Sequence, residues 1–230
     1  MRLTHLILNL TALALAAVSP LHAEDAVNAP VYVVTYFEVA PAATAQTAAA
    51  ASKFVEASRK EAGNAAYDMF EEIGRPSRFA ILEAWRDKSS LDAHNAAALS
   101  TAFRNEAQPV MVSPFGVRSF GGLSVAAPSG RGGADAVYVL THVDVFPAGK
   151  DQAVALVKEL AEAGRKDDGN LLFDVLQQDG RPNHFTLVEA WRDRTAFDAS
   201  VMATHTKDFR QKLTPLEGAL YDERLYQAVR

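Results

Sequence analysis

The most constraining feature of this 230-residue chain is that much of its sequence occurs twice, at a constant offset of 106 residues (residue 138 against residue 32) and without a gap. The segment Glu83–Asp87 returns unchanged as Glu189–Asp193. Shorter matches recur at the same offset: Tyr32 and Tyr138, Gly63-Asn64 and Gly169-Asn170, Gly74-Arg75-Pro76 and Gly180-Arg181-Pro182, Phe103-Arg104 and Phe209-Arg210. A period this long does not fit a solenoid and indicates two copies of one small domain. Differences between the copies then indicate where a site was kept and where it was lost.

The first 23 residues resemble a secretory signal peptide. Arg2 provides a short basic region, a mostly apolar run follows over residues 6–18, and residues 19–23 supply the small residues of a cleavage site. An uncleaved membrane anchor is the alternative, but the run is shorter than the ~20 residues that span a bilayer. We therefore expect residues 1–23 to be removed, and the mature protein to be periplasmic or secreted, without a membrane partner.

Charge and cysteine content narrow the function classes. The chain has 23 Lys and Arg against 28 Asp and Glu, and no basic patch, which argues against nucleic acid as a partner. It has no Cys, so disulfides, a thiol nucleophile and Cys-ligated metal sites are excluded. Histidines do not occur four residues apart beside a carboxylate, as in a zinc-binding helix. We expect neither a metal nor a cofactor.

A Gly-rich stretch without hydrophobic periodicity, residues 121–136, is expected to be a linker between domains at 31–120 and 137–230. Each domain is predicted to have the order β-α-β-β-α-β. In the first domain the elements are expected at 31–39, 43–62, 67–70, 79–85, 90–107 and 115–120. In the second domain they are expected at 137–145, 149–168, 173–176, 185–191, 196–213 and 220–229.

This element order predicts an α+β fold in which each domain is a ferredoxin-like sheet with both helices on one face. Two such sheets packed face to face would bury their uncovered faces and form a single-chain, pseudo-dimeric α+β barrel. Association of two whole chains stays open. Ser89 and Thr195 are expected to cap the second helix of each domain, with Asp92 and Asp198 as capping-box partners.

A strand ending in Glu-x-Trp-x-Asp, followed by a helix with His residues nine and fourteen positions after the Trp, resembles the antibiotic biosynthesis monooxygenase (ABM) domain of the dimeric α+β barrel superfamily. It is most similar to the quinol monooxygenases of that family. The first copy has only the earlier histidine, His94, with Leu99 at the later position. The second copy has Ser200 and His205 at these positions. The histidine pair is therefore divided between the copies.

The resemblance implies a cofactor-independent monooxygenase that oxidises a small quinol or polyphenol-type aromatic with O2, in a pocket between sheet and helices. A deprotonated quinol can itself reduce O2, so the protein must supply a dry pocket, a base and hydrogen-bond donors. A histidine can serve as the base or as a donor near neutral pH. The predicted catalytic residues are His94, His205, His142 and Tyr36, and the predicted substrate-binding residues are Trp85 and Trp191.

Each of these residues also has a structural interpretation. His94 and His205 could lie on a helix surface, and His142 and its equivalent Tyr36 could be buried between the two sheets. Trp85 and Trp191 could be apolar anchors that pack helices on the sheet.

Two further functions stay open. A non-catalytic small-ligand-binding or interaction protein fits the divided histidine pair, and export also favours it because reduced quinols are scarcer outside the cytoplasm. A haem-binding or haem-degrading relative is the second alternative. It is less favoured because strand-one residues Thr35, Tyr36, Thr141 and His142 do not include the Asn of such relatives.

Overall fold

A computed structural model of the chain describes residues 29–127 and 132–229. The predicted signal peptide, residues 1–23, lies outside this range. Within the described residues, no helix is both long enough and apolar enough to cross a membrane.

Both halves have the predicted element order, with the second helix of each divided in two. The first half comprises β1 (Val31–Val39), α2 (Thr44–Ser58), β2 (Asn64–Glu72), β3 (Arg75–Trp85), α3 (Lys88–Ala96), α4 (Ala98–Ala107) and β4 (Met111–Ser124). The second half comprises β5 (Val137–Asp144), α5 (Lys150–Gly164), β6 (Asn170–Gln178), β7 (His184–Trp191), α6 (Arg194–Met202), α7 (Thr204–Leu213) and β8 (Asp222–Ala228). Single 3-10 turns lie at Pro41–Ala43, Gln108–Val110, Pro147–Gly149 and Thr214–Leu216.

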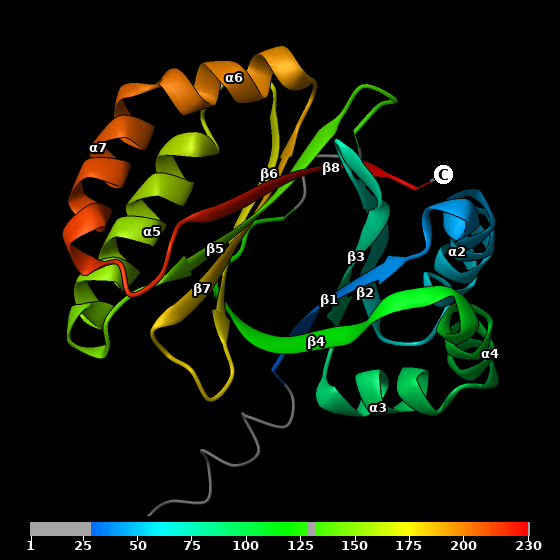
Figure 1. The fold of residues 1–230 in the computed structure, drawn as a ribbon. Helices are drawn as coiled ribbons and strands as arrows, with labels where there is room; N and C mark the ends of the chain where they lie inside the picture. Colours follow the sequence, from blue (N-terminus) through cyan, green and yellow to red (C-terminus); the bar gives the residue numbers. More distant parts are fainter. Residues whose placement is uncertain (1–28, 128–131, 230) are drawn as a thin grey trace, which may run out of the picture.

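The eight strands form one closed barrel in the order β1-β3-β2-β8-β5-β7-β6-β4 (Figure 1). The last strand of each half crosses to the other half. Gly122 of β4 pairs with Leu176 of β6, and Ala228 of β8 pairs with Phe70 of β2. Backbone ladders therefore join the halves at both seams, and among the described strands the sheet closes without a free edge. The prediction of a single-chain pseudo-dimeric α+β barrel is confirmed.

Alternation along the strands divides the apolar side chains between three cores. Val33 and Phe37 of β1 face α2, α3 and α4, which cover the first half from outside (Figure 1). Val34, between them, points into the barrel, where it joins Leu140 of the second half. The third core lies between the second half of the barrel and α5, α6 and α7. The barrel interior is thus shared by both halves, whereas each outer core belongs to one.

The linker is shorter than predicted. β4 continues to Ser124, so residues 121–124 are strand and not linker. The glycines indicated a linker, but residues of this segment pair with β6 of the other half. A partner so distant in the sequence leaves no local pattern. Residues 128–131 of the predicted linker lie outside the described residues.

The predicted second helix is interrupted in both halves. Ala97 is extended (φ −64°, ψ 144°) and separates α3 from α4; Ala203 does the same between α6 and α7. The helices also begin at a different cap from the one predicted. The Asp87 carboxylate accepts from the Ser90 amide, 2.8 Å away, whereas the Ser89 hydroxyl donates to Asp87. The cap prediction at Ser89 and Thr195 is wrong because an aspartate two residues upstream of each takes the N-cap position.

Because the ladders cross both seams, we expect the halves to stay together when the connection between them is cut. A protease site inserted at residues 127–132 should yield two fragments that co-elute as one complex in size-exclusion chromatography. Two separate, monodisperse monomers would contradict the shared barrel. The uncut protein carrying the same insertion is the control.

Candidate functional site

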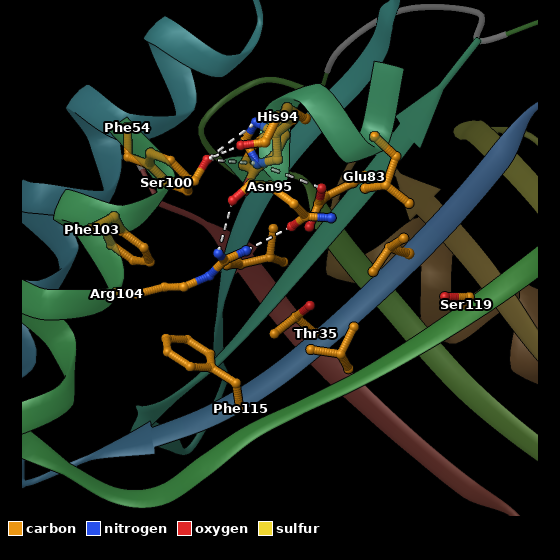
Figure 2. Close-up of a pocket in the computed structure, with 15 residues that line it drawn as sticks. Thr35, Phe54, Glu83, His94, Asn95, Ser100, Phe103, Arg104, Phe115 and Ser119 are labelled. Carbon is orange, nitrogen blue, oxygen red and sulfur yellow. Dashed lines mark hydrogen bonds and ion pairs between the residues drawn. The ribbon is translucent and has the colours of Figure 1, made fainter. Parts of the chain in front are cut away.

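A cavity of about 130 Å³ lies in the first half, between the outer face of the sheet and helices α2, α3 and α4 (Figure 2). Strand residues form its floor and helix residues its roof. Its lining comprises Val33, Thr35, Phe54, Tyr67, Ile81, Glu83, Leu91, His94, Asn95, Ser100, Phe103, Arg104, Phe115, Val117 and Ser119. Eight of these fifteen residues are aromatic or aliphatic, and the other seven are polar or charged.

His94 is the central polar group of this cavity. It lies in the last turn of α3 and is only 2% exposed. Its Nδ1 is 3.0 Å from Oε2 of Glu61, which lies between α2 and β2. A carboxylate can only accept, so Nδ1–H donates to Glu61. Nε2 is directed toward Glu83, 3.8 Å away.

The break between α3 and α4 holds His94 in place. Because Ala97 is extended, Ser100 at the start of α4 folds back, and its hydroxyl donates to the His94 carbonyl oxygen over 2.6 Å. The imidazole also packs on the Trp85 ring, with 4.7 Å between ring centroids. His94 is therefore fixed from both its backbone and its ring.

Glu83 is the second titratable group in the cavity. It stands two residues before Trp85 on β3, so both side chains lie on the same face of the strand. The Trp85 Nε1–H donates to its carboxylate over 3.0 Å. Burial raises the pKa of Glu83 above its usual range. In the repeated Glu-x-Trp motif, the tryptophan thus donates a hydrogen bond to a buried carboxyl group.

The far end of the cavity is lined by aromatic rings and a fixed arginine. Phe54 and Phe103 stack with their centroids 4.5 Å apart. Arg104 Nη2 donates to the Asn95 side-chain oxygen over 2.7 Å, which holds the guanidinium beside the cavity (Figure 2). The site combines an aromatic-walled cavity, an imidazole oriented by Glu61 and an arginine donor, which is a set suited to proton removal from a phenol.

The equivalent region of the second half is occupied by larger side chains. Leu91, Phe115, Val117 and Ser119 are replaced by Phe197, Tyr221, Glu223 and Leu225. Arg210 Nη2 donates to Glu223 over 2.8 Å, and its guanidinium lies 3.4 Å from the centre of the Tyr221 ring. Ser200 stands where His94 stands in the first half. The second half therefore keeps the packing of the site without its histidine.

His205 does not reach an equivalent cavity. It lies on α7, in an outer hollow between α5 and α7, and its Nε2 is 3.1 Å from Asp167 Oδ2. Asp167 is the counterpart of Glu61, so both histidines contact the same acidic position. They approach it from different helices because His94 ends α3 while His205 begins α7.

The structure places His142 and Tyr36 away from the cavity, on the inner face of the barrel. Their positions alternate with those that face the helices. His142 Nδ1 is 3.0 Å from the Thr186 hydroxyl, and the Tyr36 and His142 rings meet edge to face at 5.4 Å. Burial and the nearby Arg118 lower the pKa of His142 to about 4. This matches the structural interpretation of these residues.

Trp85 and Trp191 do not line the first-half cavity either. Both are fully buried, and each donates to the glutamate two residues earlier. Trp85 contacts both Glu83 and His94, so it lies behind the polar groups of the cavity. Sequence reasoning missed Glu61, Glu83, Ser100 and Arg104 as site residues. Repetition of Glu83 and Arg104 in the second copy was an available signal, but it also marks residues needed only for folding.

Within the described ranges, no group of three His, Asp or Glu side chains is arranged to hold a metal ion.

Comparisons with known proteins identify the family of both halves. The family model described as antibiotic biosynthesis monooxygenase matches residues 30–106 and 136–212. A Bacillus subtilis (strain 168) protein named "Putative monooxygenase YcnE" is 33% identical over 82 residues, which are 36% of this chain and 86% of that protein.

Solved structures extend the likeness to both halves. A protein from Fusobacterium nucleatum subsp. nucleatum ATCC 25586, titled a "Putative monooxygenase", aligns with a TM-score of 0.81 at 17% identity, over 88% of this chain and 93% of that one. An "anthrone oxidase-like protein" aligns with a TM-score of 0.66 at 14% identity, over 87% of this chain and 92% of that one. At these identities the alignments establish a common fold.

Glu189, the counterpart of Glu83 in the second half, leads to a prediction about stability. Burial raises the pKa of Glu189 to about 8, from a usual value of 4.5. The unfolded chain therefore releases this proton at a lower pH than the folded protein, and stability falls as pH rises from 4.5 to 8. Glu189→Gln should remove this loss and raise the free energy of unfolding by about 3 kcal/mol at pH 7, at ~1.4 kcal/mol per pH unit.

Denaturant unfolding at pH 4.5, 6, 7 and 8 measures the effect. The gain should be near zero at pH 4.5 and grow with pH. Glu159→Gln, at an exposed position on α5, is the matched control and should show no such trend. A gain for Glu189→Gln that does not change with pH would contradict the assignment.

Proposed function

The chain belongs to the antibiotic biosynthesis monooxygenase family through both of its copies, and from this premise we propose that it oxidises a small phenol or quinol with O2 in the first-half cavity. The observation that carries the proposal is the pairing of His94 with Glu61 beside an aromatic-walled cavity. The second half has no histidine at this position, and larger side chains stand at four of the equivalent lining positions. The protein would thus have one active site, with the second half completing the barrel.

In the proposed mechanism His94 acts as the general base. Glu61 accepts a hydrogen bond from Nδ1–H, and Nε2 of the neutral imidazole takes the proton of a substrate hydroxyl. The imidazolium formed is then stabilised by the Glu61 carboxylate, in the manner of an Asp-His pair. Arg104 borders the same cavity and supplies a donor toward the oxygen that becomes negative.

The resulting quinolate is the reductant for O2, so the reaction needs no other redox group. One electron passes from quinolate to O2, the two radicals combine to form a C–O bond, and loss of water breaks the O–O bond. The sum is hydroquinone plus O2 giving hydroxyquinone plus water. The apolar wall excludes bulk water from the radical pair.

The size of the cavity favours a substrate with a single ring. Its volume of about 130 Å³ is close to that of an engineered cavity of ~150 Å³ that holds benzene. Hydroquinones and catechols fit this volume better than tricyclic anthrones or a porphyrin. The haem alternative is correspondingly weaker.

A non-catalytic binding protein remains the second candidate, because the family's histidine pair is divided and His205 lies outside the cavity.

Residues 1–23 motivate the further proposal that the enzyme works in the periplasm or outside the cell.

Oxygen uptake by the mature chain tests the proposal. We expect uptake above the autoxidation rate with substituted hydroquinones or catechols. His94→Ala should lower kcat by roughly 10²- to 10⁴-fold, the usual contribution of a general base. His205→Ala is the matched control and should retain the wild-type rate.

Three results would count against this assignment. Folded wild-type protein without uptake across a broad panel would favour the binding protein. Equal losses in both histidine variants would contradict a single site, and faster turnover of anthrones than of single-ring quinols would contradict the size argument.

Glu61 should act as a positioning residue. Glu61→Gln keeps the shape but can present its amide N–H to Nδ1, which favours the wrong tautomer of His94. We expect kcat to fall by roughly 10- to 100-fold, the usual cost of losing a group that orients an imidazole, with little change in KM. Asp167→Asn, the equivalent change in the second half, should leave both constants unaltered. A loss confined to KM would contradict the positioning role.

A further inference from the structure

A second and larger cavity lies inside the barrel. It has a volume of about 400 Å³ and shares no lining residue with the first-half cavity. It opens at the end of the barrel where β1 and β5 begin, and equivalent residues of both halves line it. Tyr32 faces this space with Tyr138, and Asp68 with Asp174. The site therefore exists only because two halves share one interior.

The inner face of the barrel explains why this end is hollow. Side chains such as Val34, Leu140 and Phe70 fill the middle of the barrel. At the end with the cavity, Ala66, Ala84 and other small residues occupy the inward positions. An eight-stranded barrel is just wide enough for side chains to fill it or for one small ligand to replace them.

The chain that leaves β4 forms a fixed wall of this cavity. Arg165 Nη2 donates to the Ser124 carbonyl oxygen over 2.8 Å, and the Ala126 amide donates to Asp174 Oδ1 over 3.0 Å. In the first half, by contrast, Arg59 forms its ion pair directly with Asp68. The halves differ here because only one of them is followed by the connecting segment.

The chemistry of the lining is apolar with a few polar groups. Asp174 is 8% exposed, and burial raises the pKa of its carboxyl group and that of the Tyr32 hydroxyl. Each aspartate has an arginine beside it, with Arg165 Nη2 3.9 Å from Asp174. A charged ligand would lose its hydration in this cavity, and no unpaired opposite charge would compensate for that loss. The lining therefore disfavours a charged ligand.

We infer that the barrel interior is a binding site for one neutral aromatic molecule larger than a single ring, carrying a hydroxyl or amine N–H that donates to Asp174. The volume lies within the usual range for small-molecule sites. No histidine lines this cavity, so the site binds its ligand without the base chemistry proposed for the first-half cavity. It is independent of that activity.

N-phenyl-1-naphthylamine, a neutral fluorescent amine, is a suitable probe. Titration of the mature chain should give enhanced, blue-shifted emission that saturates at one equivalent. Ala66→Leu should weaken binding by at least about tenfold, because the new side chain occupies the space of a ring. This change copies Leu172, the residue at the equivalent position of the second half, so the strand accommodates it.

The control Ser119→Leu copies Leu225 and fills the first-half cavity instead. It should leave the Kd of the probe unchanged. Leu172→Ala enlarges the barrel cavity and should lower the Kd of the probe, which keeps the test decisive if Ala66→Leu does not fold. Circular dichroism and thermal unfolding verify each variant.

Two outcomes would overturn the inference. One is folded wild-type protein that does not enhance the probe. The other is binding that Ser119→Leu abolishes and Ala66→Leu or Leu172→Ala leaves unaltered, which would place the probe in the first-half cavity.

Discussion

The shared interior of the barrel is the constraint on which the rest of the molecule depends. Neither half can shield the inner face of its own sheet, where Val34 and Leu82 of one half meet Leu140 and Val188 of the other. Burial of this apolar surface is the main favourable term in folding. The crossing strands β4 and β8 close the seams and satisfy edge groups that would otherwise promote aggregation. The two copies therefore fold as one body.

This constraint leaves the outer faces free to differ. The inner positions must fit both halves at once, whereas each outer core is filled by one half and its helices. The first half has an outer cavity with His94, and the second half fills the same region with the Arg210–Glu223 pair and Tyr221. Loss of a cavity there costs no stability, because larger side chains restore close packing. A duplicated chain can thus keep a cavity in one copy and use the other copy as support.

The local sequence pattern was sufficient to predict the order of strands and helices, but it was insufficient to predict where each of them ends. The repeat, the strand alternation and the apolar helix faces correctly predicted the α+β order of both halves. The extension of β4 to Ser124 was missed because its partner strand lies in the other half. The break at Ala97 was missed because alanine is a good helix former, and the break is stabilised by the contact between Ser100 and the His94 carbonyl.

The sequence by itself determined that two copies of one α+β domain must share a barrel, and that the histidines of the family pattern are divided between them. It could not decide which histidine faces a cavity. That depended on side-chain volumes at positions 91, 115, 117 and 119 and their counterparts, which approach one another only after sheet and helices pack. The sequence also could not show that Tyr36 and His142 lie away from the cavity. Alternation along a strand defines two faces, and only tertiary packing decides which face lies inside the barrel.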